Sequence, residues 1–197
     1  DRTLLRLHQH TSYLPLTNSE IYRMIRSREY LPAEEFIRIA EKVLASAGAT
    51  LRPGIPILME GIVPEPLDIF ETLTDFGAAV VGDDLASCRR RAYPASSRKD
   101  PFERMAERIL KAPPDPTRGS SIQSRLDFLS DLASQTGARG ILFYLVKFCE
   151  PELFDIPILR QELKAAGIPS ILIEVDLNTR LSQQVRTRLG AFVEMIE

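Results

Sequence analysis

The chain has 197 residues, a length that supports one domain of ordinary size with a buried core. Hydrophobic residues make up 44% and charged residues 26%, which is typical of a soluble globular protein and excludes a disordered or fibrous one. A formal net charge of -2 gives no general basic field, so we do not expect a nucleic-acid-binding protein. No apolar run is long enough to span a membrane and no signal peptide is visible, so a cytoplasmic protein is expected.

The N-terminal quarter of the chain has a weaker pattern than the rest. The sequence opens at Asp1 with no methionine before Met24, and we therefore expect a piece of a longer protein. A short helix is predicted over residues 19–28 and an amphipathic helix over residues 34–47, with Gly48 as its C-terminal cap. Residues 1–50 are interpreted as a helical arm or as interdomain helices.

A strand–helix–strand pattern follows. An apolar run over residues 55–59 predicts a strand, residues 67–76 have helical spacing, and residues 78–81 repeat the strand pattern. Residues 82–101 show no hydrophobic periodicity and are interpreted as a long loop. Long loops in compact domains are usually functional or disordered.

The remaining elements alternate between helices and strands. A proline-rich linker over residues 113–116 separates the first two helices. In chain order the predicted elements are a helix over 102–110, a helix over 121–136, a strand over 141–146, a helix from 155 to Gly167, a strand over 168–175 and a last helix over 182–196.

Four apolar strands alternating with helices predict an α/β fold. The strands are continuously apolar rather than alternating, which indicates burial on both faces of the sheet. We expect an open three-layer sandwich in which helices flank a mostly parallel four-stranded sheet. Residues 51–197 would form this domain.

In such a sheet the ligand crevice lies beyond the carboxyl ends of the strands. The polar or reactive residues there are candidates for a site. They are Glu60 after the first strand, Asp83, Asp84 and Cys88 after the second, Lys147, Phe148, Cys149 and Glu150 after the third, and Asp176 and Asn178 after the fourth.

The two cysteines must be explained one by one, because they are too few and too far apart for a disulfide scaffold or a CxxC metal site. Cys88 and Cys149 both fall on the same edge of the predicted sheet. A free cysteine is most often a small buried hydrophobe, so a packing role and a ligand role both stay open. Cys149 follows its strand by two positions, and Pro151 is expected to keep the turn open rather than helical.

Three other kinds of site find little support. His8 and His10 could join the cysteines in a zinc site, but their spacing matches no closed pattern and they lie in the least structured part of the chain. A Cys–His nucleophile is disfavoured for the same reason. Neither a GxGxxG nor a GxxxxGK[ST] motif occurs, so no dinucleotide fingerprint or P-loop is present.

A basic stretch lies on the long loop. Arg89, Arg90, Arg91, Arg98 and Lys99 occur with no acid between Cys88 and Lys99. One interpretation is a solvated charged face. The other is an anion clamp, because guanidinium groups suit phosphates, and Arg89, Arg90 and Arg91 would then contact the phosphates of a carrier such as coenzyme A.

Several segments resemble the C-terminal domain of the 2-hydroxyacyl-CoA dehydratase and benzoyl-CoA reductase family, of the 2-hydroxyglutaryl-CoA dehydratase D-component type. Their order and spacing carry the likeness over residues 50–197, with a looser match before. The segments are residues 57–61 (ILMEG), 77–85 (GAAVVGDDL), 146–151 (VKFCEP), 167–169 (GIP), 173–176 (IEVD) and 184–192 (QVRTRLGAF).

The resemblance implies an oxygen-sensitive enzyme subunit of anaerobic metabolism, with a [4Fe-4S] cluster held by cysteines. It implies an acyl-CoA substrate, a homologous partner subunit and an ATP-dependent iron–sulfur activator that donates one electron to reduce the thioester. Low-potential electron transfer explains thiolate ligands and a dry pocket. By motif, Cys149 matches a cluster ligand, while Gln184, Thr187 and Arg188 match a last-helix motif.

The chain departs from the family pattern in two respects. Family members often have a cysteine directly after Asp-Asp-Leu, where this chain has Ala86, so Cys88 is a weaker candidate ligand. The remaining cluster cysteines of the family belong to a preceding domain. The chain is then either a trimmed fragment, without a cluster and inactive alone, or a degenerate paralogue. The paralogue would be a non-enzymatic module that binds an acyl-CoA or a partner protein.

Overall fold

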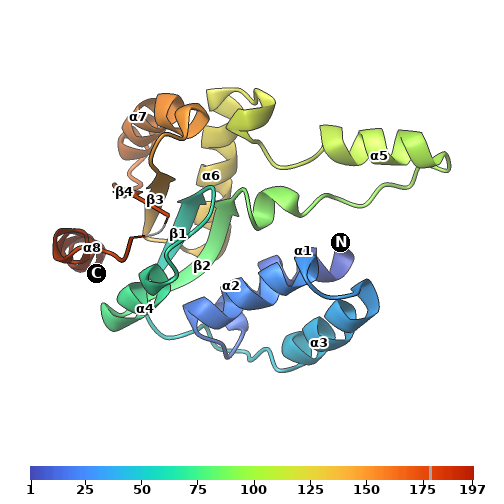
Figure 1. The fold of residues 1–197 in the computed structure, drawn as a ribbon, viewed down its shortest axis with the longest axis horizontal. Helices are drawn as coiled ribbons and strands as arrows, with labels where there is room; N and C mark the ends of the chain where they lie inside the picture. The colour runs from blue at the N-terminus through green and yellow to red at the C-terminus, as the bar shows by residue number, and fades with distance from the viewer. Residues whose placement is uncertain (178) are drawn as a thin grey trace.

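The computed structural model describes residues 1–177 and 179–197 (Figure 1). Asn178, a candidate from the sequence, lies outside the described residues. The helices of this part are α1 (Arg2–His10), α2 (Asn18–Arg26), α3 (Ala33–Ala45), α4 (Asp68–Asp75), α5 (Pro101–Leu110), α6 (Ile122–Thr136), α7 (Glu150–Ala165) and α8 (Gln183–Ile196). The strands are β1 (Ile55–Gly61), β2 (Ala78–Leu85), β3 (Gly140–Val146) and β4 (Ser170–Val175).

The four strands form one parallel sheet with the order β2-β1-β3-β4. The predicted α/β class and four-stranded parallel sheet are confirmed. The chain first adds β2 on one side of β1 and then β3 on the other, so the strand order reverses between β1 and β3. In sheets of this type the crevice at the reversal, beyond the carboxyl ends of the strands, is the usual ligand position.

The end of β1 lies unusually close to β3 at this reversal. Gly61 has φ 147°, and a Cβ atom there would lie 2.3 Å from the carbonyl oxygen of Tyr144. Only glycine allows this backbone conformation and this approach. The two strands therefore stay paired up to the point where the crevice opens.

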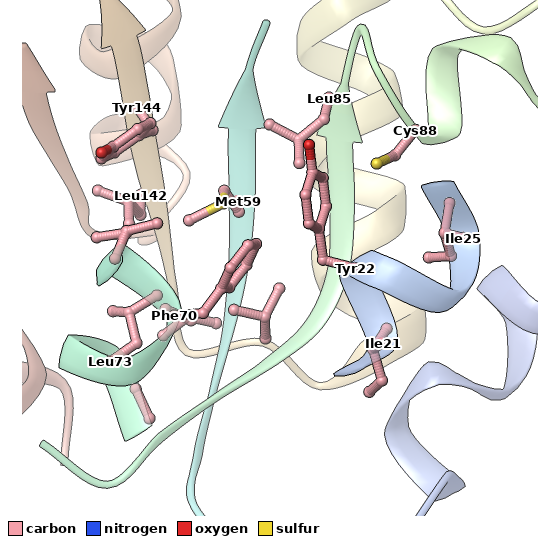
Figure 2. Packing of buried hydrophobic residues seen from close by; sticks show 14 of the residues in the cluster. Ile21, Tyr22, Ile25, Met59, Phe70, Leu73, Leu85, Cys88, Leu142 and Tyr144 are labelled. Atoms are coloured by element: carbon pink, nitrogen blue, oxygen red, sulfur yellow. The ribbon is translucent and has the colours of Figure 1, made fainter. Parts of the chain in front are cut away.

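Each face of the sheet has its own hydrophobic core. Alternate residues of a strand point to opposite faces, so Ile57 and Met59 of β1 join one core while Leu58 joins the other. Helices α4 and α8 cover the first face together with α1–α3, and α6 and α7 cover the second (Figures 1 and 2). The continuous apolar character of the strands follows from burial on both sides.

The N-terminal helices pack on the first face rather than standing apart from it. Leu4 and Leu7 of α1 are 1% exposed and share the core with strand residues. Thr17 and Glu20 form a capping box that starts α2. The next residue after Thr17, Asn18, accepts a hydrogen bond from the backbone N–H of Val80 (2.9 Å) and donates to the carbonyl of Ala78 (3.0 Å). The division into 1–50 and 51–197 stays a prediction.

Three sequence expectations differ from the structure. Strand β2 continues through Gly82 to Leu85, where the sequence predicts a loop, because Asp83 and Asp84 are buried with partners of opposite charge or with hydrogen-bond donors. Helix α7 begins at Glu150 rather than near residue 155, and Pro157 lies inside it. The histidines lie on α1, not in unstructured chain, and His8 is buried.

Helix α5 projects from the body of the molecule (Figure 1) and none of its residues is buried. Among the described residues, no helix is long and apolar enough to cross a membrane.

Candidate functional site

Cys149 lies at the carboxyl end of β3, at the reversal of strand order. It is the N-cap residue of α7: its backbone N–H donates to the carbonyl of Val146 (3.2 Å), and its own carbonyl accepts from Leu153 (3.0 Å). Its side chain is partly exposed, and burial raises the pKa of its thiol. The sequence prediction that the chain delivers Cys149 to the carboxyl edge of the sheet is confirmed.

The turn that presents Cys149 is tight. Phe148 has φ 67°, which is uncommon for a residue with a side chain, and its ring is 92% exposed. Pro151 lies in the first turn of α7, where its missing N–H is no loss. The turn at residues 147–149 is non-helical, as expected, but Pro151 does not prevent a helix from beginning at Glu150, directly after the cysteine.

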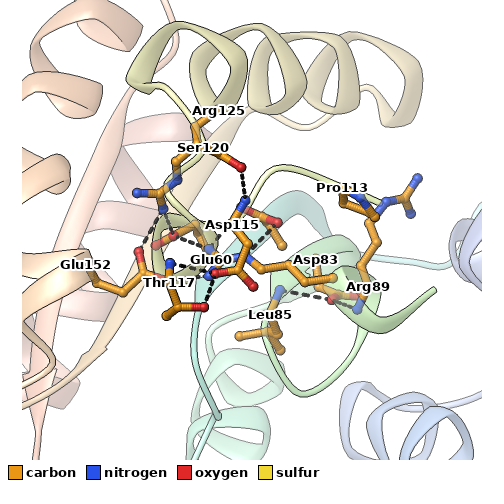
Figure 3. Close-up of polar contacts among 12 residues, drawn as sticks. Glu60, Asp83, Leu85, Arg89, Pro113, Asp115, Thr117, Ser120, Arg125 and Glu152 are labelled. Carbon is orange, nitrogen blue, oxygen red and sulfur yellow. Dashed lines mark hydrogen bonds and ion pairs between the residues drawn. The ribbon is translucent and has the colours of Figure 1, made fainter. Parts of the chain in front are cut away.

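A group of buried charged side chains lies next to the start of α7, and Figure 3 shows Glu60, Arg125 and Glu152 of this group. We call it the buried charge cluster, and its members are almost inaccessible to solvent. They are Glu60 of β1, Asp84 of β2, Arg90 of the short 3-10 helix at Arg89–Arg91, Arg125 of α6 and Glu152 of α7.

Arg90 connects three carboxylates of the cluster. Its guanidinium donates to both oxygens of Asp84 (3.0 Å each), to Glu60 (2.7 Å) and to Glu152 (2.5 Å). Such charge-assisted, partly bidentate bonds are the strongest kind available to a protein. Strands β1 and β2 are thereby joined to the first turn of α7.

Arg125 completes the connection from α6. Its Nη2 donates to Glu60 and to Glu152 (2.7 Å each), and its Nη1 donates to Asp155 in the second turn of α7 (2.7 Å). A carboxylate at the N-terminus of a helix is also favoured by the helix dipole. The first two turns of α7, and with them Cys149, are held by two buried arginines.

The carboxylates of the cluster do not titrate alike. Burial and the neighbouring Glu152 raise the pKa of Glu60 well above its ordinary value, and its Oε2 has no partner among the described residues. Burial opposes ionisation of Glu152 too, but Arg90 and Arg125 outweigh it and hold its pKa below the ordinary value. Glu60 therefore keeps its proton to a higher pH than Glu152 does, and Glu152 lies in the first turn of the helix that Cys149 caps.

Sequence reasoning finds part of this cluster. It places Glu60, Asp84 and Arg90 near the sheet edge but does not assign them to one another, and it misses Arg125 and Glu152. The available signal is the position of Arg125, which shares the inward face of α6 with Leu129 and Leu132. An arginine on an apolar helix face indicates a buried partner.

The basic stretch divides between the interior and the surface. Arg90 is 1% exposed and engaged with three carboxylates, so its guanidinium is occupied inside the chain. Arg91 is exposed and pairs with Glu29 (2.5 Å), and Arg89 lies over the ring of Phe128 at 5.9 Å from its centroid. Phosphate binding therefore stays a prediction for Arg89 and Arg91, whereas the guanidinium of Arg90 is already paired with carboxylates.

Cys88 lies in a different environment from Cys149. It is 2% exposed and belongs to the core on the face covered by α1–α3, beside Tyr22 and Ile25 (Figure 2). Burial, and next the carboxylate of Asp83, raise the pKa of its thiol well above the ordinary value. Cys149 packs against the other core, so the two sulfurs share an edge of the sheet but not a face.

These residues do not form a complete metal site. In the part of the chain that the structure describes, no three His, Cys, Asp or Glu side chains come together as a ligand set. An iron–sulfur cluster is held mainly by several thiolates. The described residues therefore do not fit a whole cluster by themselves, and Cys149 is the more exposed of the two cysteines.

Comparison with known proteins identifies the family. The model of the "2-hydroxyglutaryl-CoA dehydratase, D-component" family matches residues 2–196. The chain is 29% identical over 180 residues to lactoyl-CoA dehydratase subunit beta of Anaerotignum propionicum, with 89% of this chain and 48% of the relative covered. It is 31% identical over 144 residues to the (R)-phenyllactyl-CoA dehydratase beta subunit of Clostridium sporogenes, with 73% and 38% covered.

A benzoyl-CoA reductase is also similar. One subunit of this enzyme from Thauera aromatica is 23% identical over 194 residues, with 91% of this chain and 49% of the relative covered. The chain thus spans about half the length, or less, of the curated relatives it matches. Because the family model covers nearly the whole chain, the chain belongs to the 2-hydroxyglutaryl-CoA dehydratase D-component family.

Proposed function

We propose that the chain is part of a subunit of an iron–sulfur 2-hydroxyacyl-CoA dehydratase or benzoyl-CoA reductase, and that Cys149 supplies one thiolate ligand of its [4Fe-4S] cluster. The single observation that carries the proposal is the position of Cys149. It is the partly exposed cysteine at the reversal of strand order, in a segment that matches the family motif.

The surroundings of Cys149 support a ligand role. A metal ligand must be held in position while its donor atom stays accessible. The buried charge cluster holds the first two turns of α7, directly after Cys149. Cys88 lacks this combination, because it is enclosed in an apolar core. Further ligands would come from the portion of the relatives that this chain does not span.

The overall activity of the complex follows from this assignment. When bound, the cluster would supply an electron of low potential, delivered by an ATP-dependent activator, for single-electron reduction of an acyl-CoA thioester. A homologous partner subunit would complete the enzyme, as the subunit names of the relatives suggest. The chain's own part would be to hold Cys149 and, through Arg89 and Arg91, to contact the phosphates of coenzyme A.

The competing function is a non-enzymatic module that binds an acyl-CoA or a partner protein and has lost the cluster. The specific observation in its favour is that only two cysteines occur in the chain and that they face different cores. In this case Cys149 would be an ordinary surface residue of α7.

The test uses the full-length protein, co-expressed with its partner subunit and purified without oxygen. Iron and acid-labile sulfide are counted, and turnover of (R)-2-hydroxyacyl-CoA and benzoyl-CoA is measured with activator and ATP. The proposal predicts about one four-iron cluster per subunit and activity that needs ATP. Iron-free protein that still binds acyl-CoA would contradict it and establish the module.

A further inference from the structure

A cavity lies at the carboxyl edge of the sheet, between α2 and the loop that follows β1. It has a volume of about 380 Å³, and Glu65 and Leu67 line it from the side of the loop. Ligands of parallel sheets bind beyond the carboxyl ends of the strands, so a small molecule is expected in this position. We call it the α2 cavity.

Tyr22 is the buried polar residue that lines the α2 cavity. It is 8% exposed and its ring packs against that of Phe70, with 5.1 Å between the centroids. Figure 2 shows its hydroxyl pointing toward the carboxyl end of β2, beside Leu85. Burial raises the pKa of Tyr22 to about 12, so the hydroxyl stays protonated at neutral pH. A phenol both donates and accepts hydrogen bonds, and the neighbouring Ser87 side chain satisfies only one of these roles.

Two side chains of opposite charge line the α2 cavity without a partner. Arg23 of α2 and Glu65 make no ion pair or side-chain hydrogen bond with any described residue, and they do not pair with each other. Glu20, the acid one turn before Arg23, is held by the backbone N–H and the hydroxyl of Thr17 (2.8 Å and 2.9 Å). A cavity lined by an unpaired cation and an unpaired anion favours a ligand that carries both charges.

The other arginine of the α2 cavity is already engaged. Arg26 donates to Glu29 (2.7 Å) and to the carbonyl of Ser87 (3.1 Å), and its guanidinium lies 5.9 Å from the ring centroid of Tyr30. It therefore contributes no unpaired charge. Arg23 and Glu65 remain as the charged groups that are available to a ligand.

We propose that the α2 cavity binds a free α-amino acid with an apolar side chain. Arg23 pairs with the carboxylate, to which the Tyr22 hydroxyl also donates, and Glu65 pairs with the ammonium group. Leu31, Leu67 and the tyrosine rings contact the side chain. Such an amino acid is a small ligand with both charges and an apolar group, and the volume lies at the low end of the range for small-molecule sites, about 300–1,000 Å³.

This inference does not rest on the proposed function. Tyr22 belongs to one core of the sheet, whereas Cys149 packs against the other. The ligand carries neither a thioester nor a phosphate, and its binding needs no metal. Either proposal can therefore fail without the other.

The test is isothermal titration calorimetry of the full-length protein with L-leucine and L-phenylalanine as probes. The analogues that lack the ammonium group are 4-methylpentanoate and 3-phenylpropanoate. Those that lack the carboxylate are 3-methylbutylamine and 2-phenylethylamine, and glycine lacks the apolar side chain. We expect at least one of the two amino acids to bind, and its analogues to bind at least tenfold more weakly, because each loses a charge-assisted contact or the apolar contacts.

Variants locate the binding to this cavity. Arg23→Gln and Glu65→Gln should each weaken the binding of the amino acid by about tenfold or more, and Tyr22→Phe by about threefold to tenfold. The matched controls Arg104→Gln and Glu71→Gln remove the same charges from exposed positions outside the cavity and should change the affinity less than twofold. Arg23 is exposed and glutamine nearly preserves the size of Glu65, so both variants are expected to fold.

The proposal is overturned by any of three results. The first is no binding of either amino acid at millimolar concentration. The second is an analogue that binds as tightly as the amino acid it imitates, which would show that the missing group is not recognised. The third is binding that neither Arg23→Gln nor Glu65→Gln weakens relative to the matched controls, which would place the amino acid elsewhere.

Discussion

Cys88 and Cys149 follow the carboxyl ends of two strands that both pair with β1, yet their surroundings are opposite in kind. Cys88 is enclosed by apolar side chains and has a pKa raised well above the ordinary value by burial. Cys149 starts a helix, is partly exposed, and is supported from below by two buried arginines. The sheet topology alone gives the two residues equivalent positions. The difference shows that the packing and the polar groups around a cysteine, and not only the strand before it, decide whether its thiol is accessible.

The largest loss of stability is expected when Arg125, which holds the helix that follows Cys149, is replaced. Arg125→Met should lower the free energy of unfolding by about 3–5 kcal/mol, because it leaves Asp155 without its guanidinium partner and Glu152 with Arg90 alone. Urea unfolding measures the loss. The matched control is Arg38→Met, which breaks the exposed Arg38–Glu35 pair and should cost less than about 1 kcal/mol. Equal effects of the two variants would show that the cluster does not anchor α7.

A pH-dependent effect is expected at Glu60. Its folded-state pKa is raised, so ionising it in the native state lowers stability as the pH rises from its unfolded pKa, about 4.3, toward the folded value. Glu60→Gln imitates the protonated form and removes this loss, and each unit of raised pKa is worth about 1.4 kcal/mol. The variant should match the parent near pH 4 and exceed it at pH 8 in urea unfolding. A variant less stable than the parent at pH 8 would contradict the raised pKa of Glu60 in the folded protein.

The smallest effect is expected at Cys88. Cys88→Ser should lower the free energy of unfolding by about 1–2 kcal/mol, because it places a hydroxyl group in an apolar core. A thiol reagent applied to the native, metal-free protein should modify Cys149 quickly and Cys88 only after unfolding. Rapid labelling of Cys88 in the native protein would contradict the inference that its thiol is less accessible than that of Cys149.

Much of the fold can be predicted from the sequence, because continuous apolar runs identify strands buried on both faces. The end of β2 cannot, since Asp83 and Asp84 interrupt the apolar run, and their burial depends on His8 of α1 beside Asp83 and on Arg90 beside Asp84. The start of α7 escapes prediction because Pro157, interpreted together with Asp155 as the helix start, lies inside the helix, whereas Pro151 is the proline of the first turn.

The candidate site is predictable in position but not in construction. The spacing after β3 places Cys149 at the sheet edge, and this requires only local information. Apart from Arg90 and Asp84, which are 6 positions apart, the contacts of the buried charge cluster join residues 27 to 65 positions apart. Such pairings follow from the packing of helices on the sheet, which periodicity does not encode. The burial of His8 beside Asp83 escapes sequence reasoning for the same reason.

We propose that Cys149, and not Cys88, is the metal ligand of this chain. The direct measurement is the iron content of the full-length protein purified without oxygen, in the parent and in the Cys149→Ser and Cys88→Ser variants. Serine nearly preserves volume but is a poor iron ligand, so we expect the Cys149 variant to fold yet lose its iron and its activity together, while the Cys88 variant keeps both. Full iron content in the Cys149→Ser protein would contradict the claim.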